Sequence, residues 1–186
     1  MIYYTSRDLS KRLSIHPEKW KRWARAFLPP DPLGGLQSGV ARQFSIPDAF
    51  KVYLGGYLVG RLRFTMPEAE VILSDLAAWL KKAGFLDLNP LPADDILRRI
   101  GYHRIYIIEP EGNGFAYVIR TLTAPAALAG QAQGQACFRQ IYMGTCEAPK
   151  SDSQQDPLLS EAVLGARVVT VSALYGHFLR HLQAHD

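Results

Sequence analysis

The sequence predicts an α+β protein: a mainly helical N-terminal domain, then a small α+β domain of three or four strands and a C-terminal helix. Capping pairs and helical hydrophobic spacing dominate residues 5–84. Runs of β-branched and aromatic residues then appear between residues 103 and 171, before helical spacing returns. We therefore expect domains at 1–84 and 94–186, joined by a linker at 85–93.

Composition limits the class of protein. The 186 residues are 48% hydrophobic, which is enough for one sizeable core or two small ones. No run approaches the roughly 20 apolar residues of a membrane-spanning helix, and the polar first residues predict no signal peptide. Cys137 and Cys146 lack metal-site spacing, so we expect free thiols. The sequence thus predicts a cytoplasmic protein with no membrane partner.

Capping residues predict where the first two helices begin. Thr5 and Asp8 form a capping box that predicts a helix over residues 6–13. After a tight turn, His16 caps a second helix over residues 17–27, which begins with proline. Its inner side is aromatic and its outer side carries cations: Lys19, Lys21, Arg22 and Arg25. This pattern is typical of a helix-turn-helix.

A loop and two more helices follow. Prolines and glycines over residues 28–43 exclude a helix and favour an extended loop or hairpin, the position of a wing. Polar groups there that could contact phosphates are Gln37, Ser38 and Arg42. Pro47-Asp48 opens a third helix, which Gly55-Gly56 should weaken or kink. Thr65 and Glu68 form a second capping box, and Gly84 should end this fourth helix.

Positive charge is concentrated in the first half. Residues 1–82 hold 13 Lys and Arg against 7 Asp and Glu, whereas residues 83–186 hold 8 against 10. Clustered cations on one module suit a polyanion, because neutralising phosphates releases condensed counterions. A solvated helical face is the alternative explanation of the charge alone.

From about Tyr4 to Leu80 the sequence resembles the DNA-binding domain of the MerR family of transcription regulators. YTSRDLSKRLSIHPEKWKRWARAFLPP is similar to that family's helix-turn-helix, and Arg42-Gln43-Phe44 to the signature that closes its wing. The resemblance implies that Lys19 and Lys21 face DNA and that Arg25 occupies a commonly basic position. Asp48, Phe64, Thr65 and Glu68 continue the agreement.

The sequence departs from that family in three ways. Its wing segment is rich in proline and glycine, and Lys21 replaces an arginine, which keeps the charge but loses bidentate geometry. The long dimerising helix expected after the fourth helix is absent, since periodicity ends near Lys82. The family's operator spacing therefore cannot be transferred to this chain.

The second half predicts strands at His103–Glu109, Phe115–Thr123, Ala136–Thr145 and Ala166–Val171. PEGNG between the first two predicts a hairpin turn, and Ser172 should cap the final amphipathic helix. This unit could dimerise the protein or sense a small-molecule effector, and no residue pattern identifies such an effector.

Histidines recur every four residues on the final helix: His177, His181 and His185. Two such imidazoles can chelate a metal when a third ligand converges, but the sequence offers none. We interpret them as a partly exposed helix face and predict neither metal nor other cofactor. No nucleophile lies in a known catalytic motif, so an enzyme is not expected.

The sequence therefore predicts a bacterial transcription regulator that binds double-stranded DNA as a homodimer. The helix at residues 17–27 would enter the major groove, and Thr5 would help to anchor the DNA backbone. Gln37, Ser38 and Arg42 would hold its flank. One alternative is an adaptor that binds a protein partner. Another is an excisionase-like architectural DNA binder.

Overall fold

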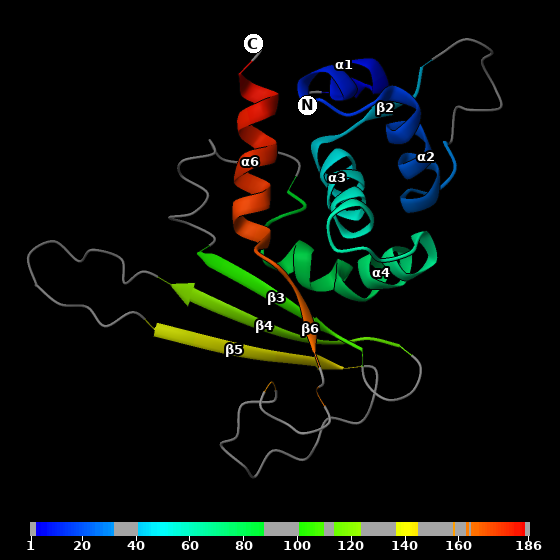
Figure 1. Cartoon of the computed structure of the whole chain (residues 1–186). Coiled ribbons are helices and arrows are strands. Elements are labelled where there is room, and N and C mark those ends of the chain that lie inside the picture. Colours follow the sequence, from blue (N-terminus) through cyan, green and yellow to red (C-terminus); the bar gives the residue numbers. More distant parts are fainter. Residues whose placement is uncertain are drawn as a thin grey trace, which may run out of the picture. The chain divides into compact units, whose positions relative to one another are not determined.

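The computed structural model describes residues 3–31, 41–87, 101–109, 114–123, 137–144, 158, 163 and 165–184 (Figure 1). Over these residues the fold is α+β, as predicted, with two small antiparallel sheets. The chain divides into two compact units. The first comprises Met1–Asp94 together with Tyr175–Asp186, and the second comprises Asp95–Leu174.

Capping side chains begin the first two helices where the sequence predicts them. Helix α1 spans Ser6–Arg12, and the reciprocal bonds between Thr5 and Asp8 form its capping box. Helix α2 spans Pro17–Phe27, and His16 accepts a hydrogen bond from the Glu18 amide. At each helix start a side chain thus accepts a hydrogen bond from one of the amides that the helix leaves unpaired.

Helix α3, Ile46–Gly60, corrects one expectation. Gly55 and Gly56 do not interrupt it: the helix runs through both glycines, and both are buried. A β-carbon at Gly55 would lie 2.5 Å from the Phe27 ring, and one at Gly56 would lie 2.3 Å from the Trp23 ring. These glycines therefore let α2 approach α3 closely, a gain in packing that outweighs their low helix propensity.

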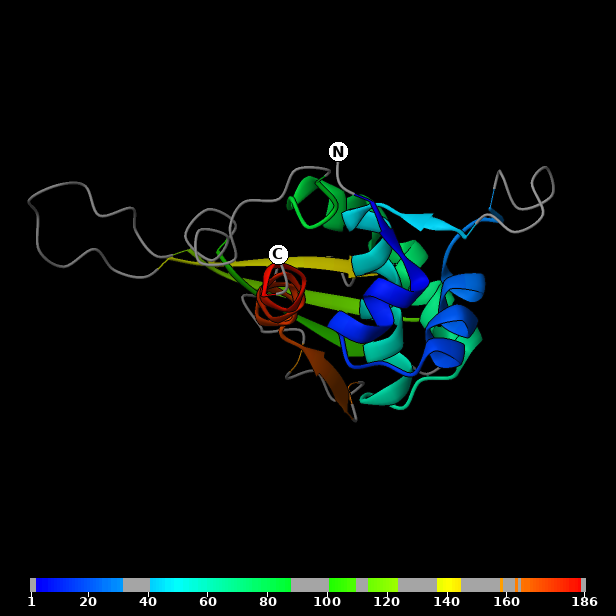
Figure 2. The same cartoon turned by 90° about the horizontal axis from the view of Figure 1, so that it is seen from above.

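Helix α4, Met66–Lys82, begins at the predicted capping box of Thr65 and Glu68. Gly84 follows its end with a φ of 85°, a left-handed conformation that favours glycine. One face of α4 is buried, as its periodicity predicts: Ala69, Ile72, Leu73, Leu76, Trp79 and Leu80. Helices α2, α3 and α4 pack around this shared core (Figure 2).

A two-stranded sheet joins the start of the first unit to the far side of the predicted wing. Strand β1, Tyr4–Thr5, pairs antiparallel with β2, Gln43–Phe44. This pairing was not predicted from the sequence, because strands of two residues carry no periodic signal. It fixes the point at which the chain leaves residues 28–43. The tip of that segment, residues 32–40, lies outside the described residues.

The last helix, α6, spans Val171–Gln183 and was expected to belong to the second domain. From Tyr175 onward it belongs to the first unit instead. Tyr175 and Phe178 lie with their ring centroids 4.6 and 5.4 Å from that of Phe50, and both are fully buried. Aromatic burial thus attaches the end of the chain to α3.

The second unit contains a four-stranded antiparallel sheet of order β5-β4-β3-β6 (Figure 1). Its strands are β3 Tyr102–Ile108, β4 Ala116–Thr123, β5 Cys137–Gly144 and β6 Ala166–Val169. All four predicted strands are confirmed, with ends that shift by one or two residues. The expected turn at residues 110–113 and the loop at 124–135 lie outside the described residues.

Ser172 has a different role from the one predicted. Helix α6 begins before it, at Val171, so Ser172 is not its cap. Its buried hydroxyl accepts a hydrogen bond from the His103 amide at 2.8 Å and donates one to the Gly101 carbonyl at 3.0 Å. The serine therefore satisfies backbone groups at the start of β3.

None of the described helices combines the length and apolar character that crossing a membrane requires.

Candidate nucleic-acid interface

Helix α2 separates an aromatic face from a cationic one. Trp20, Trp23 and Phe27 are at most 5% exposed and face the core. The exposed positions of the helix carry the predicted cations: Lys19, Lys21, Arg22 and Arg25. Burial of one face thus fixes which side chains the other face presents.

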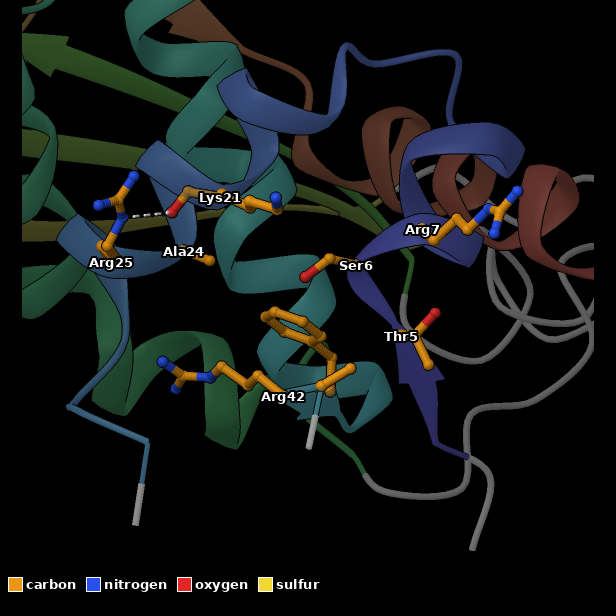
Figure 3. Close-up of a pocket in the computed structure, with 9 residues that line it drawn as sticks. Thr5, Ser6, Arg7, Lys21, Ala24, Arg25 and Arg42 are labelled. Atoms are coloured by element: carbon orange, nitrogen blue, oxygen red, sulfur yellow. Dashed lines mark hydrogen bonds between the residues drawn. The ribbon is translucent and has the colours of Figure 1, made fainter. Parts of the chain in front are cut away.

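Beside this helix lies a pocket of about 650 Å³ (Figure 3). Its lining comes from α1, α2 and the chain that enters β2: Thr5, Ser6, Arg7, Lys21, Ala24, Arg25, Ala41, Arg42 and Phe44. Four of these nine residues are cationic and none is acidic. The pocket therefore presents a field of one sign to a ligand.

Arg25 and Arg42 are held at the pocket wall by backbone carbonyls. Arg25 Nε donates to the Lys21 carbonyl at 3.4 Å, and Arg42 donates to the Pro29 carbonyl at 2.9 Å. The Arg42 guanidinium also lies 5.5 Å from the centroid of the Phe44 ring. Each guanidinium keeps further N–H donors for an anion, since it has five.

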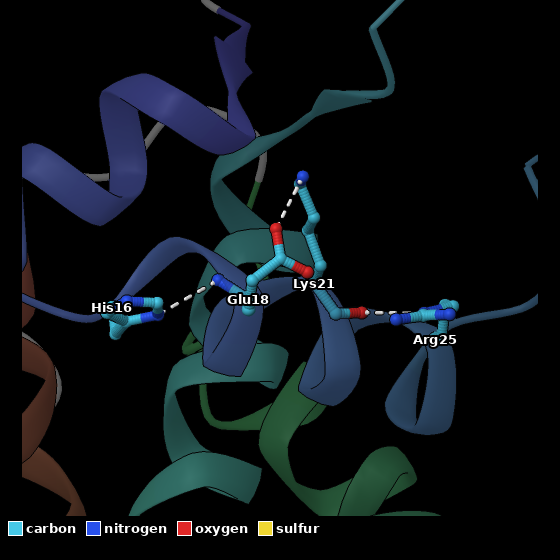
Figure 4. Close-up of polar contacts among 4 residues, drawn as sticks. All are labelled: His16, Glu18, Lys21 and Arg25. Atoms are coloured by element: carbon cyan, nitrogen blue, oxygen red, sulfur yellow. Dashed lines mark hydrogen bonds and ion pairs between the residues drawn. The ribbon is translucent and has the colours of Figure 1, made fainter.

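Lys21 is paired with a carboxylate. Its Nζ lies 2.9 Å from Glu18 Oε1 in an exposed i,i+3 ion pair (Figure 4). The hydrogen bond from Lys21 and its charge hold the pKa of Glu18 below its usual value. An exposed pair of this kind contributes little stability and is easily exchanged. Glu18 therefore competes with any anionic ligand for Lys21.

Thr5 lines the pocket, but its hydroxyl is used in the capping box. It donates to Asp8 Oδ2 at 2.6 Å and accepts from the Asp8 amide at 3.3 Å. The Thr5 amide donates to the same carboxylate at 3.0 Å. These bonds hold the pKa of Asp8 below its usual value. Thr5 thus fixes the start of α1, and its hydroxyl already donates to Asp8 rather than to a ligand in the pocket.

The other predicted residues lie elsewhere. Lys19 Nζ lies 4.9 Å from the centroid of the Trp23 ring and lines a second, separate pocket with Tyr57 and Arg61. Arg22 is exposed on α2 but does not line the cationic pocket. Gln37 and Ser38 lie outside the described residues. The structure therefore brings together Thr5, Lys21, Arg25 and Arg42.

Arg7 and Ser6 line the same pocket and were not predicted as site residues. Arg7 extends from α1, and its guanidinium points away from Lys21, Arg25 and Arg42 (Figure 3). Its place in the dense run of cations from Arg7 to Arg25 was the available signal. What the sequence lacked was the β1–β2 pairing, which places the start of α1 beside Arg42.

Comparison with known proteins gives no match to a protein family, to a curated protein or to a solved structure.

Proposed function

We propose that this protein is a sequence-specific transcription regulator that binds double-stranded DNA as a homodimer. The cationic pocket beside α2 carries the proposal, because Lys21, Arg25 and Arg42 all line it and no acidic residue does. Such a surface suits the phosphate backbone, which supplies most of the affinity for DNA through counterion release.

The dimensions of α2 support insertion into the major groove. Eleven residues at 1.5 Å each give a helix about 16 Å long, which a groove about 12 Å wide admits. With its aromatic face buried, α2 presents Arg22 as the exposed cation best placed to reach bases, since Lys19 lies over the Trp23 ring and Lys21 is paired with Glu18. Arg25 and Arg42, held by carbonyls at the pocket wall, are suited to phosphates.

The resemblance to the MerR family supports the same arrangement. In this proposal α1 and α2 form the helix-turn-helix, and residues 28–43 form the wing. The pairing of β1 with β2 would anchor the wing next to the start of α1. The four-stranded sheet of the second unit is the proposed seat of dimerisation or effector sensing.

The Glu18 carboxylate competes with DNA phosphates for Lys21. In the free protein it partly neutralises Lys21. On binding, a phosphate would replace the carboxylate, and Glu18 would be left facing negative charge. Glu18 therefore lowers affinity for all DNA alike and leaves discrimination to direct base contacts.

The test is selection from a random duplex library at two salt concentrations, followed by sequencing of the bound fraction. We expect an enriched palindromic site whose affinity falls steeply with salt. Recovery of no duplex at low salt would refute the proposal and favour a protein partner. A bound site without symmetry would instead refute the homodimer.

Variants then assign the contacts. Lys21→Ala, Arg25→Ala and Arg42→Ala should each weaken binding and each reduce the salt slope by about 1 if the residue contacts a phosphate. Lys82→Ala is the matched control, because Lys82 is an exposed cation at the far end of α4. Equal affinity of a triple pocket variant and the wild type would overturn the assignment.

A further inference from the structure

Two histidines on α6 point their ring nitrogens at each other. His177 Nε2 lies 3.1 Å from His181 Nε2, and the two ring centroids are 4.3 Å apart. Both side chains reach solvent. Residues four apart on a helix lie one above the other, so the backbone of α6 holds this spacing.

We propose that His177 and His181 form a chelating site for a divalent transition-metal ion. Nitrogens bound about 2.0–2.1 Å from a metal lie about 2.9 Å apart at a right angle and about 3.4 Å apart at the tetrahedral angle. The observed 3.1 Å falls between these values. The two rings therefore already stand at chelating distance. In the free protein the two Nε2 atoms share a hydrogen bond, so an ion would displace the proton between them but would not require the helix to be rebuilt.

Tyr53 supplies the outer contact that such a site needs. Its Oη lies 3.0 Å from Nδ1 of His177, on the ring edge away from His181. With a metal on Nε2, Nδ1 carries the proton and donates it to the tyrosine oxygen, which fixes the tautomer and the ring plane. The Tyr53 ring is itself held against Phe178, with centroids 5.4 Å apart.

The surroundings of the two histidines affect the binding of a metal ion in two opposite ways. Burial, His181 and Arg180 together lower the pKa of His177. A neutral ring is the form that binds a metal. Arg180 directly precedes His181 on the same helix, and its positive charge repels a metal cation. Among the described residues no cluster of three or more His, Cys, Asp and Glu occurs, so water would complete the coordination.

The test uses the full chain without an affinity tag, titrated at pH 7.5 with Cu²⁺ and separately with Zn²⁺ by calorimetry. We expect one ion per chain, tighter for Cu²⁺ than for Zn²⁺ in line with the usual order of divalent metals. Electron paramagnetic resonance of the Cu²⁺ form should show two coordinated nitrogens from imidazole.

Variants separate this site from adventitious binding. His177→Ala and His181→Ala should each abolish the one-to-one binding event. His16→Ala, which replaces the exposed histidine that caps α2, should retain it. Tyr53→Phe should weaken binding about 10–100-fold, as loss of an outer-shell partner does. Arg180→Ala should strengthen it.

Because both histidines reach solvent, the variants should fold, and unfolding curves without metal check this. His177→Gln provides a second variant that keeps a polar side chain of similar reach. Absence of saturable binding to the wild type, or unchanged stoichiometry and affinity in the His177 variants, would overturn the proposal.

Discussion

Gly56→Ala tests the close contact between helices α2 and α3. The added β-carbon would lie 2.3, 2.4 and 2.7 Å from three carbons of the Trp23 ring. Apolar carbons prefer separations of about 3.5–4.0 Å, so the ring or the helix would have to move by about 1 Å. Trp23 is only 5% exposed, and the open space beside its ring is the pocket that it lines with Gly56, Tyr57 and Arg61.

The expected loss follows from two opposing contributions. Overpacking of a closed core costs about 1–3 kcal/mol. Alanine is favoured over glycine in a helix by about 1 kcal/mol, which offsets part of that cost. Since Gly56 faces a rigid ring at the shortest of these distances, we expect the free energy of unfolding to fall by about 1–2 kcal/mol.

Gly60→Ala is the matched control on the same helix. A β-carbon at Gly60 meets nothing within 4 Å, so the helix preference acts alone and stability should rise by up to about 1 kcal/mol. Urea unfolding followed by tryptophan fluorescence measures both variants, because Trp20, Trp23 and Trp79 all belong to the first unit. A Gly56→Ala protein as stable as Gly60→Ala would refute the reasoning.

Four further predictions follow from single contacts. Thr65→Ala removes the cap of α4 and should lower the free energy of unfolding by about 0.5–2 kcal/mol, measured by chemical denaturation. Ser172→Ala removes a buried hydroxyl with two backbone partners, and a loss of about 1–3 kcal/mol in the same assay is expected. Because the pKa of Asp8 is lower in the folded state, its contribution to stability is complete above about pH 4 and disappears as pH falls through the folded value. Asp8→Asn should thus differ from the wild type at pH 7 and match it in strong acid; a gap that persists there would contradict this cause. Glu18→Gln frees Lys21 and should tighten binding to specific and random duplexes alike, whereas unchanged affinity for both in gel-shift titrations would show that the ion pair does not compete with DNA.

Local signals in the sequence predicted the helices of the first unit well. Thr5, His16 and Thr65 cap their own helices through contacts within three residues, so their effect depends on local sequence alone. The strands of the second unit also followed from local composition. The prediction for Gly55-Gly56 was wrong because these glycines serve close contacts with Phe27 and Trp23, which lie 28 and 33 residues away.

The candidate site was predicted only in part for the same reason. The cations of α2 follow from helical spacing, and Lys21 and Arg25 do line the pocket. Arg7 joins them through the pairing of Tyr4 with Phe44, a contact between residues 40 apart that no local pattern encodes. Lys19 turns toward Trp23 instead, because a cation gains from the face of an aromatic ring.

The last helix has a consequence for how the chain is made. During synthesis the N-terminus leaves the ribosome first, and domains usually fold as they emerge. Here the first unit needs Tyr175 and Phe178 against Phe50, so its core stays incomplete until nearly the whole chain has been synthesised. A chain that stops at residue 94 would leave this aromatic surface uncovered. Premature termination should therefore yield a product prone to aggregation rather than a stably folded first unit.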